Sequence, residues 1–182
     1  QAPVAGDESR WLDLCAGPGG KAALLAGWAA ERGITLTAVE PNPTRAALVE
    51  SALAGAPGQP IVVCQDGRQV QGTFDRILID APCSGLGSLR RRPEARWRKQ
   101  PGDIPALAAL QRELLDHAAG LVRPGGIIGY STCSPHLAET DVVVARFLRT
   151  HPDFEGAADP MRLRTDLDGT DGMFLALLRR RA

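Results

Sequence analysis

Residues 11–21 read WLDLCAGPGGK and contain the feature that decides the fold. The apolar run at 11–15 has the length and composition of a buried strand, and it leads directly into a glycine-rich turn. Glycine at a strand-to-helix turn lets the backbone approach a ligand closely, because no Cβ intrudes. Residues 20–31 follow with helical character. The stretch therefore predicts a strand, a ligand-binding turn and a helix.

The same alternation continues along the chain. We expect further strands at 34–40, 60–64, 74–80, 126–131 and 173–178, and further helices at 43–53, 104–121 and 137–149. Strands separated by helices predict βαβ units with right-handed crossovers. We predict a Rossmann-like α/β fold, with a mostly parallel seven-stranded sheet and helices on both faces. The domain is expected to cover residues 11–182, after a polar lead-in at 1–10 that ends a preceding region.

The composition is that of an ordinary globular domain, with 44% hydrophobic and 23% charged residues among 182. No apolar run approaches the roughly 18 residues that a membrane span needs, and no signal-peptide pattern opens the chain. We expect a cytoplasmic monomer without a membrane partner. The four cysteines are too widely spaced for a zinc site or a disulfide framework, so we expect reduced thiols and no metal.

Acidic residues follow the second and third predicted strands. Glu40 stands where a carboxylate would hydrogen-bond both ribose hydroxyls of a nucleoside. Asp66 is placed to accept a hydrogen bond from an adenine amino group. The glycine turn also satisfies the loose dinucleotide pattern, which leaves an NAD-dependent oxidoreductase as an alternative. Asp13, Pro18 and Lys21 in the turn favour S-adenosylmethionine over a pyrophosphate.

Two cysteines lie just beyond the ends of two later strands. Cys83 follows the strand at 74–80 in DAPCSG, and Cys133 follows the strand at 126–131 in YSTCSP. Cys64, within an apolar run, and Cys15 are interpreted as packing residues. A thiolate that adds to C6 of cytosine makes C5 able to attack a methyl sulfonium, and a carboxyl such as Asp80 can assist at N3. A second thiol can then help to release the product.

Basic residues are concentrated in one segment, although the chain has 21 basic and 21 acidic side chains and no net charge. Residues 90–99 read RRRPEARWRK. We predict that this run contacts RNA phosphates, with Trp97 either stacking on a base or packing beneath the loop; a solvated surface is the alternative interpretation. The basic residues of the run are Arg90, Arg91, Arg92, Arg96, Arg98 and Lys99.

The motifs DLCAGPGGK, AVEPN, DAPCSGLGSLRRRPEARW and YSTCSPHLAE resemble those of the RsmB-like, or Sun-family, RNA cytosine-5 methyltransferases. The resemblance extends from Trp11 to the closing DGMFLALLRR. It implies S-adenosylmethionine as cofactor and RNA, ribosomal by expectation, as substrate. A glycine at position 17 replaces an alanine common in the family, a change expected to be harmless.

The resemblance also implies residue roles. Cys133 is the nucleophile, Cys83 assists release of the methylated base, and Lys21 and Asp80 reach the cytosine. The cofactor positions map onto Cys15, Ala16, Gly17, Pro18, Gly19, Gly20, Lys21, Glu40, Asp66 and Asp80. A tRNA cytosine-5 methyltransferase and a catalytically silent RNA-binding module with the same fold remain alternatives.

Overall fold

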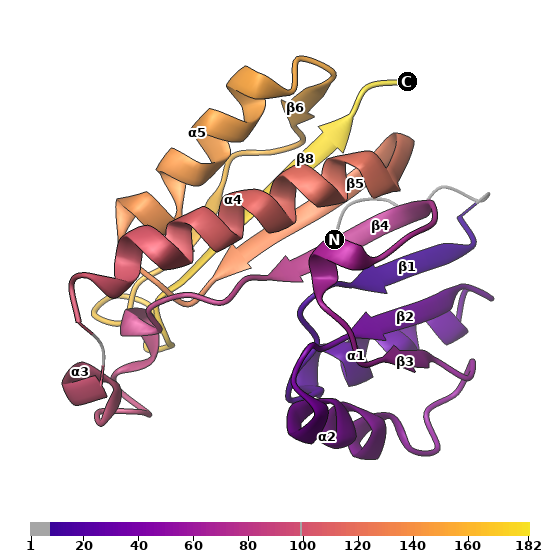
Figure 1. Cartoon of the computed structure of the whole chain (residues 1–182), viewed down its shortest axis with the longest axis horizontal. Helices are drawn as coiled ribbons and strands as arrows, with labels where there is room; N and C mark the ends of the chain where they lie inside the picture. The colour runs from indigo at the N-terminus through magenta and orange to yellow at the C-terminus, as the bar shows by residue number, and fades with distance from the viewer. Residues whose placement is uncertain (1–7, 99) are drawn as a thin grey trace.

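The computed structural model describes residues 8–98 and 100–182, and its central feature is one mixed β-sheet (Figure 1). The strands are β1 (Arg10–Asp13), β2 (Thr35–Val39), β3 (Ile61–Val63), β4 (Phe74–Asp80), β5 (Val122–Thr132), β6 (Phe154–Gly156), β7 (Met161–Leu163) and β8 (Met173–Arg180). They follow the order β3-β2-β1-β4-β5-β8-β6, with β7 paired to β8 outside this path.

The sheet is parallel from β3 through β2, β1 and β4 to β5. The last strands, β8, β6 and β7, pair antiparallel. The predicted Rossmann-like α/β fold is confirmed, although the described residues form eight strands where seven were expected. The strands β6 and β7 were not predicted, because each is only three residues long and shows no clear alternation.

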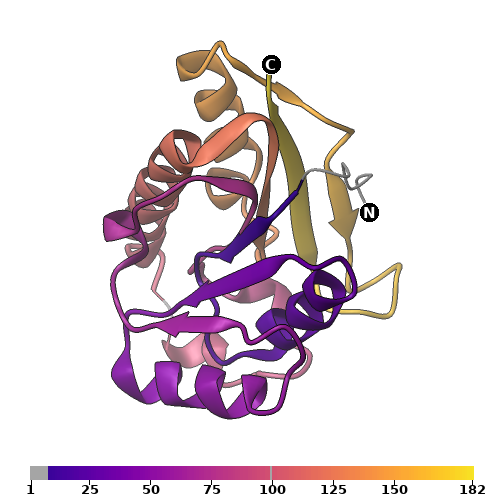
Figure 2. The same ribbon diagram turned by 90° about the vertical axis from the view of Figure 1, so that its right-hand side faces the viewer.

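Helices cover both faces of the sheet. They are α1 (Gly20–Ala30), α2 (Pro43–Leu53), α3 (Ala95–Arg98), α4 (Asp103–Leu121) and α5 (Asp141–Thr150), with short 3-10 turns η1 (Gly67–Gln69), η2 (Leu86–Ser88) and η3 (Leu137–Glu139). In Figure 2, α4 and α5 lie to the left of the strands and α1 lies to the right. No helix among the described residues has the length and apolar composition needed to cross a bilayer.

The core is divided between the two faces. Under α4 and α5, Leu115 and Phe147 pack against sheet residues such as Ile128. Under α1 and α2, small residues such as Ala26 pack near Val49. The start of α2 is fixed locally, because Oδ1 of Asn42 accepts the N–H of Arg45 and Pro43 takes the first helical position.

The prediction of one continuous helix at 137–149 is wrong, because the structure divides this segment into η3 and α5. Thr140 interrupts it with φ −128° and ψ −98°, which are not helical angles. Glu139, immediately before the break, is 0% exposed and turns its carboxylate inward. The buried position of this carboxylate explains why the backbone leaves the helical path.

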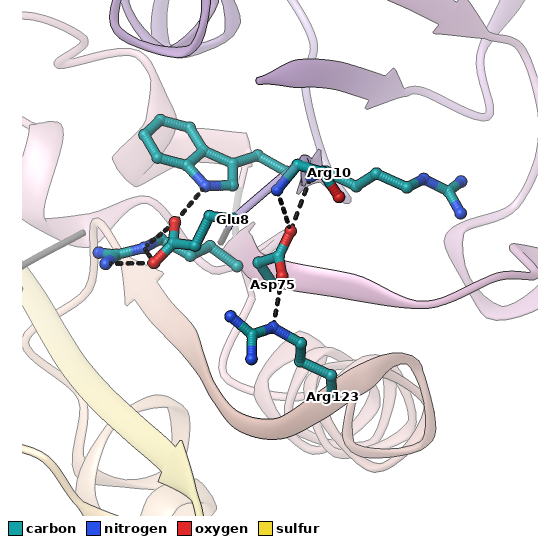
Figure 3. A network of polar contacts seen from close by, with 7 residues as sticks. Glu8, Arg10, Asp75 and Arg123 are labelled. Atoms are coloured by element: carbon teal, nitrogen blue, oxygen red, sulfur yellow. Dashed lines mark hydrogen bonds and ion pairs between the residues drawn. The ribbon is translucent and has the colours of Figure 1, made fainter. Parts of the chain in front are cut away.

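Asp75, near the start of β4, holds the segment that leads into β1 (Figure 3). Its Oδ2 accepts the backbone N–H groups of Ser9 at 2.8 Å and Arg10 at 2.7 Å. Its Oδ1 accepts a hydrogen bond from Nε of Arg123 in β5. These three donors hold the pKa of the Asp75 carboxyl below its ordinary value, against the opposing effect of burial.

Glu8 continues this anchoring on the other side of β1. Its carboxylate accepts a hydrogen bond from the indole N–H of Trp11 and is paired with the guanidinium of Arg76 at 2.8 Å. The expected boundary between residues 1–10 and 11–182 therefore falls inside a network of contacts. Residues 8–10 pack with the sheet and do not behave as an irregular lead-in; β1 itself begins at Arg10.

An apolar cavity of about 180 Å³ lies between α1 and the sheet. Trp11, Trp28, Leu78 and Leu177 are among its lining residues. The acidic and thiol groups that the sequence places at the strand ends do not line it. These groups lie instead at the carboxyl edge of the sheet, where ligands bind in open α/β sheets.

Candidate active site

The glycine turn packs tightly against the residues that follow β2. The N–H of Ala16 donates to the carbonyl of Val39 at 2.8 Å, which joins the turn to the end of that strand. A Cβ on Gly17 would lie 2.1 Å from Oε2 of Glu40. The neighbouring atoms are the far ends of the Glu40 and Arg45 side chains, so alanine at this position would require these two side chains to shift. The expectation that alanine at position 17 is harmless therefore depends on this movement.

Glu40 is 3% exposed and is held from two directions. Its Oε1 accepts the N–H of Asn42 at 3.0 Å, and its Oε2 lies 3.4 Å from the guanidinium of Arg45. Arg45 also donates to the carbonyl of Gly17 at 2.7 Å. Arg45 is a site residue that the sequence reasoning missed, since an arginine in the first turn of a helix carries no distinctive signal.

Asp66 lies at the end of the connection after β3, as predicted, and caps η1. Arg68 binds both of its carboxylate oxygens, and Arg68 also pairs with Glu113 of α4. The hydrogen bonds from Arg68 lower the pKa of Asp66 to about 2. The carboxylate therefore stays ionised, and its remaining lone pairs can accept a further hydrogen bond.

Asp13 is a buried acid at the end of β1 beside the glycine turn. Its Oδ2 is buried without a hydrogen-bond partner, whereas its Oδ1 accepts the N–H of Cys15 at a long 3.4 Å. Burial raises the pKa of Asp13 to about 7. Burial, together with the charge of Asp13, also raises the pKa of the Cys15 thiol, so this thiol is not a nucleophile.

Lys21 and Asp80 come together at the carboxyl edge of the sheet. Nζ of Lys21, at the start of α1, donates to Oδ2 of Asp80 at 2.7 Å. The two residues are 59 positions apart in the sequence and are joined because β1 and β4 are adjacent parallel strands. That Lys21 and Asp80 reach the cytosine stays a prediction.

Cys83 and Cys133 face each other across the same edge. Their Sγ atoms are 3.4 Å apart, and both side chains are partly exposed. All four cysteines are free thiols. Cys64 departs from its predicted role as a buried packing residue, because it is exposed at the end of β3.

The contact between the two thiols shifts their pKa values in opposite directions. The hydrogen bond from the Cys83 thiol stabilises a Cys133 thiolate and lowers the pKa of Cys133. The same thiolate, together with burial, raises the pKa of Cys83. Lys21 adds a smaller favourable effect on Cys133, which Asp80 opposes. Cys133 is therefore the better nucleophile of the two in the free protein.

A second set of residues behind the thiols was not predicted. The Glu139 carboxylate receives hydrogen bonds from Ser84 and Ser134, each of which directly follows one of the two cysteines. The repeated Cys-Ser pair was a signal in the sequence, but nothing in the sequence indicated that the two serines share one acceptor.

The loop after Cys83 is also bound through its backbone. The N–H of Gly87 donates to the carbonyl of Cys133 at 2.9 Å, and the N–H of Gly172 donates to the carbonyl of Gly87 at 2.8 Å. A Cβ on Gly87 would lie 2.0 Å from the Gly172 oxygen, so this close approach requires glycine.

The arginine run continues from this loop. Figure 1 shows α3 beyond the ends of β4 and β5. Arg91 is fixed by an ion pair with Asp171 at 2.5 Å, and Arg92 pairs with Glu94 at 3.6 Å. Trp97 is 79% exposed, so of its two predicted alternatives packing beneath the loop is wrong, and stacking on a base stays a prediction. Arg90, Arg96 and Arg98 are exposed, and Lys99 lies outside the described residues.

The remaining predicted residues are placed as expected around the turn. Cys15, Ala16, Gly17, Pro18 and Gly19 lie between β1 and α1, and Gly20 is the first residue of α1. Within the described ranges, no cluster of three or more histidine, cysteine or acidic side chains has an arrangement that could hold a metal ion.

Known proteins resemble this chain over nearly its whole length. The sequence profile of the family described as "16S rRNA methyltransferase RsmB/F" matches residues 2–179. "Putative methyltransferase Rv1407" of Mycobacterium tuberculosis is 54% identical over 98% of this chain and 42% of its own length. "Ribosomal RNA small subunit methyltransferase B" of Vibrio cholerae is 37% identical over 97% of this chain and 42% of its own length. The chain thus spans about two fifths of these curated relatives.

Solved structures share the architecture. The crystal structure of PH0851 has a TM-score of 0.86 and 31% identity, covering 95% of this chain and 43% of that one. NSun6 from Pyrococcus horikoshii, solved with SFG, has a TM-score of 0.85 and 25% identity, covering 97% and 49%. Because the profile match covers residues 2–179, this chain belongs to the 16S rRNA methyltransferase RsmB/F family.

Proposed function

We propose that this chain is the catalytic domain of an S-adenosylmethionine-dependent enzyme that methylates C5 of a cytosine in ribosomal RNA. The observation that carries the proposal is the approach of Cys83 and Cys133 to 3.4 Å beside the Lys21–Asp80 pair. A silent RNA-binding module would need neither thiol. We further propose that the protein acts as a cytoplasmic monomer, that residues 11–182 contain the catalytic unit, and that residues 8–10 belong with it.

The residues around the glycine turn fit S-adenosylmethionine. Glu40 supplies a buried carboxylate for ribose hydroxyls, and Asp66 supplies free lone pairs for an adenine amino group. The unpartnered Oδ2 of Asp13 offers an acceptor that a cationic ligand group would satisfy. The related NSun6 was solved with SFG, an S-adenosylmethionine analogue, which supports the same cofactor class here. When bound, S-adenosylmethionine supplies the methyl group.

In the proposed reaction, Cys133 attacks first. Its thiolate forms a bond to C6 of the cytosine, and the electron pair of the C5–C6 double bond moves so that C5 becomes nucleophilic. The addition leaves negative charge on N3, and the Asp80 carboxyl, oriented by Lys21 and acting in its protonated form, gives N3 the proton that promotes the addition. The lowered pKa of Cys133 supports its assignment as the attacking group.

Cys83 completes the cycle after C5 has been methylated. It first loses its own proton to solvent and, as a thiolate, accepts the C5 proton. The electrons of that C–H bond re-form the C5–C6 double bond, Cys133 leaves as a thiolate, and the N3 proton returns to Asp80. Formation of the adduct removes the charge of Cys133, and with it a cause of the raised Cys83 pKa. Cys83 therefore becomes easier to deprotonate at the step where a base is needed.

The test is bisulfite sequencing of cellular RNA with and without the full-length gene, together with a strain that carries Cys133→Ala. One ribosomal cytosine should lose its methyl group in the deletion and in the variant, and regain it with the wild-type gene. A methylated position that changes only in tRNA would assign the alternative substrate. Unchanged cytosine-5 methylation in all RNA would refute the proposed activity.

A further inference from the structure

We infer that Glu139 is a positioning residue that clamps the two cysteine loops together and so sets the contact between Cys83 and Cys133. This inference rests on the proposed function for its catalytic meaning. The contact between the two thiols is a property of the protein alone, so it can be measured without RNA or cofactor.

The clamp consists of one carboxylate and two serines. Oε1 of Glu139 accepts the backbone N–H of Ser84 at 2.8 Å. Oε2 accepts the hydroxyls of Ser84 and Ser134, both at 2.6 Å, and the two hydroxyl oxygens are themselves 3.2 Å apart. Because Ser84 follows Cys83 and Ser134 follows Cys133, a single side chain fixes the residue next to each thiol.

A second layer fixes Glu139 in turn. Nε2 of Gln111 in α4 donates to Oε1 of Glu139 at 3.2 Å and to the carbonyl of Pro82 at 2.8 Å. The hydroxyl of Tyr130 in β5 donates to the backbone carbonyl of Glu139 at 2.8 Å and contacts Oε1 of Gln111 at 3.2 Å. Gln111, Tyr130 and Glu139 are all 0% exposed.

The donors in this network indicate that Glu139 positions the two cysteine segments and does not serve mainly to stabilise the fold. Glu139 has no salt bridge with any described residue. Four hydrogen bonds from neutral donors therefore replace the water that this buried carboxylate has lost. Three of the four come from the residues that follow the cysteines. A buried acid is costly in a core that apolar side chains could fill, and its contacts concentrate on the two segments whose spacing the chemistry requires.

The experiment measures the alkylation of Cys133 by iodoacetamide as a function of pH, with peptide mass spectrometry to separate the cysteines. Loss of the clamp should separate the thiols, remove the hydrogen bond from Cys83 and move the alkylation midpoint of Cys133 to higher pH. Removal of a negative charge alone would move the midpoint to lower pH, because Lys21 and Arg91 would then be less opposed. The direction of the shift therefore distinguishes positioning from electrostatics.

Four variants make the test specific. Glu139→Ala should raise the midpoint and slow alkylation at neutral pH by about tenfold, in line with the loss of most of the thiolate. Glu139→Gln keeps one oxygen for the Ser84 N–H and offers an amide to the hydroxyls, but it removes the negative charge, so its midpoint should stay at the wild-type pH or move below it. Ser84→Ala and Ser134→Ala each remove one arm of the clamp and should give intermediate shifts, which keeps the test decisive if Glu139→Ala does not fold.

Val143→Ala is the control for lost stability, since it truncates a buried core residue on α5 without touching the clamp. It should leave the midpoint unchanged. The inference is overturned if Glu139→Ala and both serine variants keep the wild-type profile, if Val143→Ala shifts it equally, or if Glu139→Gln raises the midpoint as far as Glu139→Ala. The two proposals can fail separately. If the alkylation test confirms the clamp but the protein methylates no RNA, the proposed function is refuted and the inference about Glu139 still holds.

Discussion

Sγ of Cys83 and Sγ of Cys133 are 3.4 Å apart although 50 residues separate them in the chain. The proximity arises because β4 and β5 are parallel neighbours that end at the same edge of the sheet. Cys83 follows shortly after the last residue of β4, and Cys133 directly follows the last residue of β5. Both thiols can therefore reach the same pyrimidine, and their order of action becomes an experimental question.

Cys83→Ala should accumulate a covalent complex between protein and RNA that survives denaturing electrophoresis, because attack and methyl transfer remain possible while release is slowed. Cys133→Ala should form no such complex, since no bond to C6 can form. Cys64→Ala, at an exposed thiol remote from the pair, is the matched control and should behave as wild type. A complex that builds up in Cys133→Ala and is absent from Cys83→Ala would reverse the two roles.

The Glu40 carboxylate should control cofactor affinity. Glu40→Ala should weaken S-adenosylmethionine binding by about 1.5–3 kcal/mol, which is typical of a hydrogen bond to a charged group. Gly17→Ala should weaken binding less than Glu40→Ala, because its methyl group moves only the far end of the Glu40 side chain. Gly27→Ala, within α1, is the matched control, since a Cβ there meets nothing within 4 Å. Calorimetry that gives one dissociation constant for all three variants would remove Glu40 from the site.

The arginine run should contribute to RNA affinity through released counterions. Neutralising Arg96 and Arg98 should flatten the slope of log affinity against log salt by about 1.4–1.8. Arg32 and Arg149, near the carboxyl ends of α1 and α5, are the control pair and should leave the slope unchanged when neutralised. Equal slopes in the two double variants would show that residues 90–98 form only a solvated face.

Asp13 should make the free protein less stable as the pH rises. Its pKa changes from 3.8 to about 7 on folding, so between these pH values the folded state holds a proton that the unfolded state has released. The free energy of unfolding should therefore fall as the pH rises through this range, by up to about 4 kcal/mol, and level off above it. Urea denaturation should show a flatter profile for Asp13→Asn, whereas the exposed Asp159→Asn should follow the wild type.

Asp75→Ala should destabilise the domain by about 3 kcal/mol, since it removes the acceptor of two backbone N–H groups and a charge-assisted hydrogen bond to Arg123. Asp153→Ala removes an exposed ion pair with Arg180 and should cost less than about 1 kcal/mol. Equal midpoints of thermal unfolding for these two variants would mean that the contacts of Asp75 do not stabilise the entry to β1.

Helices and strands could be predicted from the sequence wherever their bounds depend on neighbouring residues. The bounds of α2 and β4 were predicted to the residue, because an Asn-Pro start and an apolar run bounded by polar residues are local signals. The two cysteines were found because each follows such a strand. The ion pair of Lys21 with Asp80 was not predicted, although both residues were expected at the carboxyl ends of the strands.

Features that depend on distant contacts were not predictable in this way. Glu139 is 55 residues from Ser84, and its spacing within the sequence suits an ordinary amphipathic helix. Its inward turn breaks that helix at Thr140, which the local pattern could not reveal. The same reason applies to Trp97, whose exposure depends on where the loop lies and not on the residues beside it.

The anchoring of residues 8–10 has a practical consequence. Strand β4 carries Asp75 near one end and Asp80 at the other, and five residues of extended chain span roughly 17 Å. The entry to β1, which Asp75 anchors, therefore lies at the end of the strands opposite to the thiols. The domain can therefore be immobilised on a surface through this end, with its cysteines still facing the solution.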